Sequence, residues 1–255
     1  MADEQERSKR LRERIKLALP VRVVCRESAG HEWTEMSRLT DVTPFGAGFV
    51  LTRPTEIGRL LYLTLPMPRQ LRCFDHIEDQ YRVWALVRRV VPRMERGLAG
   101  GYETQLRYEI GVAFTGKNPP ASYVREPATR YEIDSLSPDN NLWQLREIEE
   151  KKTGGDASRS QETRLHMAFG VRVEVFDEEG RVSASEQTVT ENISRRGAAV
   201  WTTLKVERGR FVRLTSADSG LSVIAAVRGA RTGPDGILRL HLEFIDRQWP
   251  LEGLE

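Results

Sequence analysis

The chain contains the sequence DVTPFGAGF at residues 41–49, and a related sequence, NISRRGAAV, at residues 192–200. The two align at an offset of 151 without a gap, and the same register continues through the segments that begin at Gly58 and Gly209. Similarity that persists at one separation over a long segment indicates an internal repeat. The 255 residues therefore predict two copies of one domain of about a hundred residues each.

Both copies have the pattern of short β-strands. The runs VRVEV at 171–175 and LRLHLEF at 238–244 alternate between apolar and polar residues, which is the period of a strand with one buried face. Turn-forming residues separate such runs, for example DEEG at 177–180. Short strands with turns at close intervals predict small antiparallel barrels or sandwiches.

Composition indicates a soluble globular protein, with 39% hydrophobic and 30% charged residues. No stretch approaches the roughly 18 apolar residues of a membrane-spanning helix. The amino terminus, MADEQERSKRLRERIK, has charges where a signal peptide has its apolar region, so we expect a cytoplasmic protein without membrane insertion. The net charge of +2 excludes a protein whose whole surface attracts polyanions.

Metal and disulfide chemistry have no support in the sequence. Cys25 and Cys73 are isolated, with no CxxC pair, which favours free thiols in a reducing compartment. The four histidines are scattered along the chain. We expect no metal and no cofactor.

The segment between the two copies is rich in proline and glycine, which favours a linker. Within it Leu142, Leu145 and Ile148 recur at helical spacing, which predicts a helix near residues 138–152. The predicted division is a first domain with a basic N-terminal arm at 1–116, a linker at 117–158 and a second domain at 159–255.

Each copy has an arginine pair before its first strand and, about 27 residues later, a polar turn that ends in glycine. The candidate residues are Arg10, Arg14, Asp41, Thr43 and Gly46 in the first copy, and Arg159, Arg164, Asn192, Ser194 and Gly197 in the second. This layout resembles the PilZ family, which is defined by the motifs RxxxR and [D/N]xSxxG. The resemblance covers both halves of the chain and implies an all-β protein of two six-stranded antiparallel β-barrels of the split-barrel type in tandem.

PilZ domains typically bind cyclic di-GMP, so the resemblance implies a non-enzymatic receptor in bacterial second-messenger signalling. In this interpretation the arginine arm closes over the nucleotide on the barrel face. Arginine can pair bidentately with guanine or grip a phosphate, and Asp or Asn can accept from guanine N–H groups. The implied partners are cyclic di-GMP and an unidentified downstream protein. A homodimer is compatible with this interpretation, and we expect no DNA or RNA.

Both copies depart from the family pattern, so the sequence does not decide which of them binds the nucleotide. The first has Thr43 in place of serine, followed by Pro44; threonine keeps the hydroxyl, but proline removes an N–H. The second has Ser160 four residues before Arg164, so Arg159 can serve only if the arm absorbs one extra residue.

Three other functions remain as alternatives. The imperfect motifs, and longer loops near residues 67–80 and 92–106 of the first copy, favour an adaptor that binds a protein without nucleotide. A single-strand RNA binder would need aromatic residues among the arginines of the arm, which has none. An enzyme is disfavoured because no constellation of acid, base and nucleophile emerges.

Overall fold

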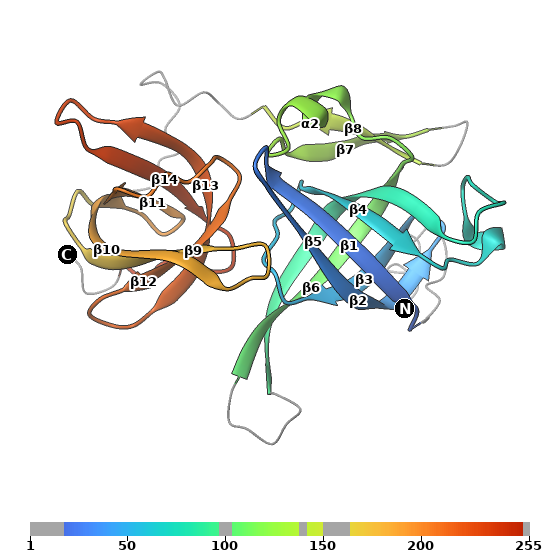
Figure 1. The fold of residues 1–255 in the computed structure, drawn as a ribbon, viewed down its shortest axis with the longest axis horizontal. Helices are drawn as coiled ribbons and strands as arrows, with labels where there is room; N and C mark the ends of the chain where they lie inside the picture. The colour runs from blue at the N-terminus through green and yellow to red at the C-terminus, as the bar shows by residue number, and fades with distance from the viewer. Residues whose placement is uncertain (1–17, 97–103, 138–141, 150–163, 252–255) are drawn as a thin grey trace, which may run out of the picture.

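The computed structural model describes residues 18–96, 104–137, 142–149 and 164–251. Two closed, six-stranded antiparallel barrels lie next to each other (Figure 1), which confirms the fold class. The first barrel consists of β1 (Pro20–Ser28), β2 (His31–Thr43), β3 (Gly46–Leu51), β4 (Leu60–Leu65), β5 (Tyr81–Arg96) and β6 (Thr104–Gly116). The second consists of β9 (Gly170–Phe176), β10 (Val182–Ile193), β11 (Gly197–Thr202), β12 (Phe211–Ser216), β13 (Ser222–Thr232) and β14 (Leu238–Phe244).

The two barrels have the same strand order, as expected of a repeat. Around the first the order is β1-β2-β3-β6-β5-β4, and around the second it is β9-β10-β11-β14-β13-β12. Alternate residues of each strand point into the barrel, and each barrel has a core of its own. In β11, for example, Ala198 and Val200 belong to the core of the second barrel, so Gly197, Ala199 and Trp201 lie on its outer face.

The prediction of a helix near residues 138–152 is wrong. Residues 143–147 of the predicted segment form the strand β8 (Trp143–Glu147), which pairs with β7 (Tyr131–Leu136). A short helix, α2 (Ala121–Arg125), comes earlier in the chain. This segment packs on the first barrel (Figure 1), where Leu142 enters the barrel core and Leu145 lies against a second cluster. The spacing of the leucines reflects these contacts and not a helix.

The first barrel has additions that the second lacks. A loop containing the single turn of 3₁₀ helix η1 (Arg69–Leu71) connects β4 to β5, and β5 and β6 continue past the barrel as a long hairpin (Figure 1). Strand β5 has 16 residues and β6 has 13, against 11 in β13 and 7 in β14. These are the two places where the repeat predicted longer loops.

The barrels contact each other through equivalent loops. The β1–β2 turn of the first meets the β11–β12 loop of the second, where the Gly30 N–H donates to Glu207 Oε2 over 3.2 Å. Conversely, Arg53 in the β3–β4 loop donates to the carbonyl oxygens of Asp177 and Glu178 in the β9–β10 turn, both at 2.8 Å. The contact therefore has approximate two-fold symmetry, like that between the subunits of a homodimer.

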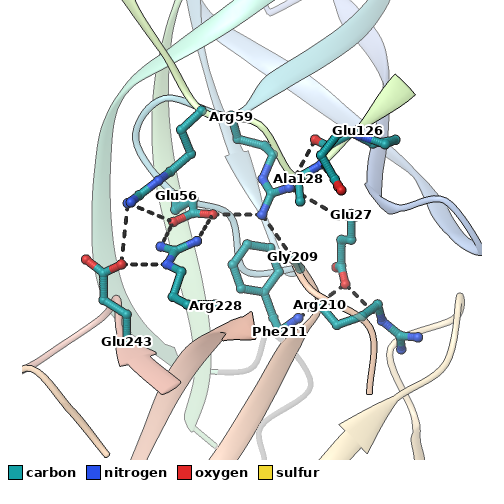
Figure 2. Close-up of polar contacts among 12 residues, drawn as sticks. Glu27, Glu56, Arg59, Glu126, Ala128, Gly209, Arg210, Phe211, Arg228 and Glu243 are labelled. Atoms are coloured by element: carbon teal, nitrogen blue, oxygen red, sulfur yellow. Dashed lines mark hydrogen bonds and ion pairs between the residues drawn. The ribbon is translucent and has the colours of Figure 1, made fainter. Parts of the chain in front are cut away.

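Buried charges dominate this interface (Figure 2). Arg59 is fully buried and donates to the carbonyl oxygens of Glu27 (3.1 Å), Pro127 (3.2 Å) and Gly209 (3.0 Å). Its Nη2 also lies 2.7 Å from Glu56 Oε1. One side chain thus links the first barrel, the segment between the barrels and the second barrel.

Glu56 is the carboxylate that joins the cations of both barrels (Figure 2). It is 5% exposed and accepts hydrogen bonds from two nitrogens of Arg228 in β13, while Arg130 Nη1 lies 3.7 Å away. Burial alone would raise the pKa of Glu56, but Arg59 and Arg228 outweigh it and lower the pKa to about 2. The carboxylate is therefore charged over the whole physiological range of pH.

Candidate functional site

The motif hydroxyl shapes the turn that carries it. Thr43 Oγ1 accepts from the Phe45 N–H at 3.2 Å and donates to the Gly46 carbonyl oxygen at 3.4 Å. Ser194 makes the same two contacts, with the Arg196 N–H and with the carbonyl of its own motif glycine, both at 3.3 Å. Threonine therefore replaces serine without loss of these bonds.

The motif glycines lie against a neighbouring strand. A Cβ atom on Gly46 would lie 2.2 Å from the carbonyl oxygen of Val112, and one on Gly197 would lie 2.4 Å from that of Leu242. Neither position can hold a side chain unless the barrel backbone moves. The glycine of the motif thus has a structural role in both copies.

The polar residue that begins the motif lies at the end of β2 or β10. Asn192 is 9% exposed, and its Oδ1 accepts from Arg164 Nη1 at 3.3 Å. The structure therefore brings the second arginine of the arm onto the motif of the second barrel. Asp41 is partly exposed, and its Oδ2 accepts from Thr40 Oγ1 at 3.4 Å. Arg10, Arg14 and Arg159 lie outside the described residues.

Asp41 and Asn192 each begin a row of cross-strand neighbours on the outer face of their barrel. The row of the first barrel consists of Asp41, Gly48, Gly111 and Arg89. The row of the second consists of Asn192, Ala199, His241 and Gly229. The rows point outward because the adjacent residues of the same strands, such as Phe49 and Val200, belong to the cores.

The row of the second barrel is covered by side chains. Ala199 points outward yet is 0% exposed, between Asn192 and the partly buried His241. Burial, and then the positive charge of Arg164, lower the pKa of His241, so its ring is neutral at pH 7. Arg164 thus lies close enough to influence both Asn192 and His241 in this row.

The next outward-facing position along β14 holds an arginine that is paired with two carboxylates. Arg239 lies across from Trp201 and is ion-paired with Glu191 and Asp235, each at 2.7 Å. Hydrogen bonds to these carboxylates raise the pKa of Arg239. With both carboxylates bound, this guanidinium has little capacity left for a phosphate group.

The two central positions in the row of the first barrel are glycines. Gly48 is buried, and a Cβ atom there would lie 2.7 Å from Thr40 Oγ1 and 2.8 Å from Asp41 Oδ2. Within the part of the chain that the structure describes, a Cβ atom on Gly111 would meet only Arg89, at 3.4 Å from its Cβ and 3.8 Å from its Nε. The Arg89 side chain is half exposed and pairs with Glu109, which also lies 2.6 Å from Arg93 Nη2. A cation therefore lies at the far end of the row from Asp41.

A groove of about 580 Å³ adjoins this row on the outer face of the first barrel. It extends from Pro20, where β1 begins, along β2 to Thr40, the neighbour of Asp41. Two arginines, Arg38 and Arg107, and two glutamates, Glu35 and Glu95, line it, and Arg107 pairs with Glu95 at 3.2 Å. The groove therefore starts where the N-terminal arm joins the barrel.

Metal chemistry finds no site in the part of the chain that the structure describes, where no group of three or more His, Cys, Asp or Glu residues could hold an ion. Cys25 and Cys73 form no disulfide with each other. No helix within the described ranges has the length and apolar character needed to cross a bilayer.

The sequence was also compared with known families and proteins. The family model of the PilZ domain matches residues 158–248. These residues are a PilZ domain. The first barrel has the same strand order as this PilZ domain. Its motif turn is also the same, since the hydroxyls of Thr43 and Ser194 both donate to the carbonyl of the motif glycine. No curated protein matches the chain significantly.

Solved structures with a similar arrangement include the inhibitor of motility MotI/DgrA of Bacillus subtilis, at 14% identity, covering 91% of this chain and 90% of that one, with a TM-score of 0.28. PlzA of Borreliella burgdorferi in complex with c-di-GMP gives 10% identity, 99% and 96% coverage and a TM-score of 0.28. MrkH of K. pneumonia in complex with c-di-GMP is 11% identical, with 90% of this chain and 81% of that one covered and a TM-score of 0.29. With TM-scores this low, the assignment depends on the match of the PilZ domain and on the barrels themselves.

Sequence reasoning missed two sets of residues, one beside the PilZ motifs and one at the interface between the barrels. His241 and Arg89 lie in the motif rows, but only the strand register reveals it. Arg59 and Arg210 hold the interface, and a signal was available, since the repeat aligns Gly58-Arg59 with Gly209-Arg210. Arginine at the same place in both copies indicated a shared role.

Proposed function

We propose that the protein is a non-enzymatic receptor for cyclic di-GMP. The observation that carries the proposal is the repetition of one motif geometry at the end of β2 and β10, the second copy lying inside the matched PilZ domain. Two of the solved structures above contain c-di-GMP, which agrees with this ligand class.

The chemistry of the motif residues supports a ligand with guanines and phosphates. Asp41 and Asn192 offer acceptor oxygens that suit the N–H groups of guanine. Arg164 lies on Asn192, where its guanidinium can turn toward a phosphate or toward guanine O6 and N7. The ligand would displace the bond between Arg164 and Asn192 or add to it, and so couple the arm to the barrel.

Titration calorimetry with cyclic di-GMP tests the proposal. Wild-type protein is expected to release or absorb heat, and GMP at the same concentration is expected to give none. Arg14→Ala and Arg164→Ala are the informative variants, since each removes the second arginine of one arm. Arg146→Ala is a matched control, because Arg146 is an exposed arginine on β8, paired with Glu132 and far from both motifs in sequence. An absence of heat with the wild type would refute the receptor.

A second candidate is a nucleotide-independent adaptor, which the additions to the first barrel favour. The β4–β5 loop exposes 86% of Ile77, and the long β5–β6 hairpin exposes 61% of Met94. Exposed apolar side chains on projecting segments suit a protein partner. A partner captured equally well with and without cyclic di-GMP would support this candidate. That no DNA or RNA binds stays a prediction.

A further inference from the structure

The motif faces of the two barrels differ at one position of the strand register. The third residue of the row is Gly111 in the first barrel and His241 in the second. Both lie on the last strand of their barrel, two strands away from the residue that begins the motif. The same site thus has no side chain in one copy and an imidazole in the other.

In the second barrel this imidazole completes a closed surface. Ala199 is 0% exposed, Ser194 3% and Asn192 9%. The charged groups that influence His241 are Arg164 from the arm, Glu191 from β10, Arg231 from β13 and Arg239 on its own strand β14. A base laid on this row would have to displace the ring and the bond between Arg164 and Asn192.

In the first barrel the equivalent surface is more exposed at most positions, although Gly48 is buried beside the side chains of Thr40 and Asp41. Asp41, Thr43 and Gly46 are all partly exposed, and among the described residues a Cβ atom on Gly111 would contact only the Arg89 side chain. The groove that starts at Pro20 reaches this row at Thr40. A ligand can therefore lie along the row with an acceptor at one end, Asp41, and a cation at the other, Arg89.

We propose that cyclic di-GMP binds to the first barrel, and that the residue at the Gly111/His241 position decides this. Glycine admits the ligand to the row, and histidine excludes it. Arg89 then contacts the end of the ligand that is farther from Asp41. This inference rests on the proposed receptor function and adds to it the barrel that binds.

The main test exchanges the deciding residue between the copies. Gly111→His places in the first barrel the side chain that the second holds at the same register position, and a Cβ atom at Gly111 would lie 3.4 Å from the Cβ of Arg89, an ordinary contact distance. We expect Gly111→His to weaken binding of cyclic di-GMP at least about tenfold, and His241→Gly to leave the affinity within about twofold. Circular dichroism and thermal unfolding verify that both variants are folded.

A second pair of variants keeps the proposal testable if Gly111→His does not fold. Arg89 and Arg93 both pair with Glu109, so Arg89→Ala and Arg93→Ala each remove one partner of the same carboxylate. Only Arg89 belongs to the row. We expect Arg89→Ala to weaken binding about fivefold or more, and Arg93→Ala to change it by less than about twofold.

The possible results distinguish the receptor function from the assignment of the ligand to the first barrel. No heat with the wild type overturns the receptor function and this inference together. Binding by the wild type that survives Gly111→His unchanged, or that His241→Gly weakens, overturns the assignment to the first barrel and leaves the receptor function standing. Equal effects of Arg89→Ala and Arg93→Ala overturn the contact with Arg89.

Discussion

Replacing Glu56 with glutamine should weaken the interface between the barrels by a predictable amount. The substitution keeps the shape of the side chain but removes the negative charge that faces Arg59, Arg228 and Arg130. The fall in the pKa of Glu56 from 4.5 to about 2 corresponds to ~3 kcal/mol, at about 1.4 kcal/mol per unit of pKa. We expect Glu56→Gln to lower the free energy of unfolding at pH 7 by about this amount.

The pH dependence gives the prediction a second, independent reading. The pKa of Glu56 is lower in the folded state, so its stabilising contribution is complete above pH ~4.5 and is lost as the pH falls toward 2. In the wild type, protonated Glu56 resembles glutamine. The difference in unfolding free energy between wild type and Glu56→Gln should therefore shrink as the pH is lowered from 5 to 3.

Urea unfolding followed by tryptophan fluorescence measures this difference, because Trp33 is buried in the first barrel and Trp249 in the second. Glu132→Gln is the matched control, since Glu132 pairs with Arg146 at 2.7 Å but is 45% exposed. We expect that control to cost less than about 1 kcal/mol. A cost below about 1 kcal/mol for Glu56→Gln at pH 7, or a difference that does not change with pH, would refute the reasoning.

Two further predictions concern the backbone. Gly209→Ala should cost ~3 kcal/mol or more, because Gly209 has φ +92° and a Cβ atom there would lie 2.3 Å from the Glu27 carbonyl oxygen. Gly220→Ala is its control: φ is +67° with open space around it, so only the backbone strain of about 1–2 kcal/mol remains. Ser194→Ala should cost about 1 kcal/mol by removing the two bonds of the motif turn. Ser194→Thr should change stability by less than ~0.5 kcal/mol, because Thr43 makes the same bonds. Urea unfolding measures the loss of unfolding free energy for each variant. Equal losses for Gly209→Ala and Gly220→Ala, or for Ser194→Ala and Ser194→Thr, would contradict the corresponding prediction.

The barrels were predictable because their information is local and occurs twice. Alternation identified strands such as β9 and β14, and the repeat showed that the motif turn recurs in the same place. The region around β8 was not predictable in this way. Leu142 and Leu145 have helical spacing, but their positions are determined by two apolar clusters on the first barrel. Tertiary contacts of this kind override a local pattern.

The candidate sites were predictable as motifs but not as surfaces. Sequence spacing placed Asp41 and Asn192 in polar turns that end in glycine, whereas the residues beside them come from strands distant in the chain. His241 is 49 residues from Asn192 in sequence, and only the register of β10, β11 and β14 brings them into one row. The interface charges escaped prediction for a related reason, since Glu56 and Arg228 are 172 residues apart.

The symmetry of the interface has a consequence for how far the two motifs can communicate. The barrels touch through the turn that precedes β2 and the turn that precedes β10, whereas the motifs lie where these strands end. The second motif is nevertheless one strand away from the interface charges, because Gly197 lies across from Glu243, whose carboxylate pairs with Arg228 and Arg130. A ligand at the second motif would therefore act within one strand of the carboxylate that pairs with Arg228, whereas the first motif glycine, Gly46, lies across from the uncharged Ala113.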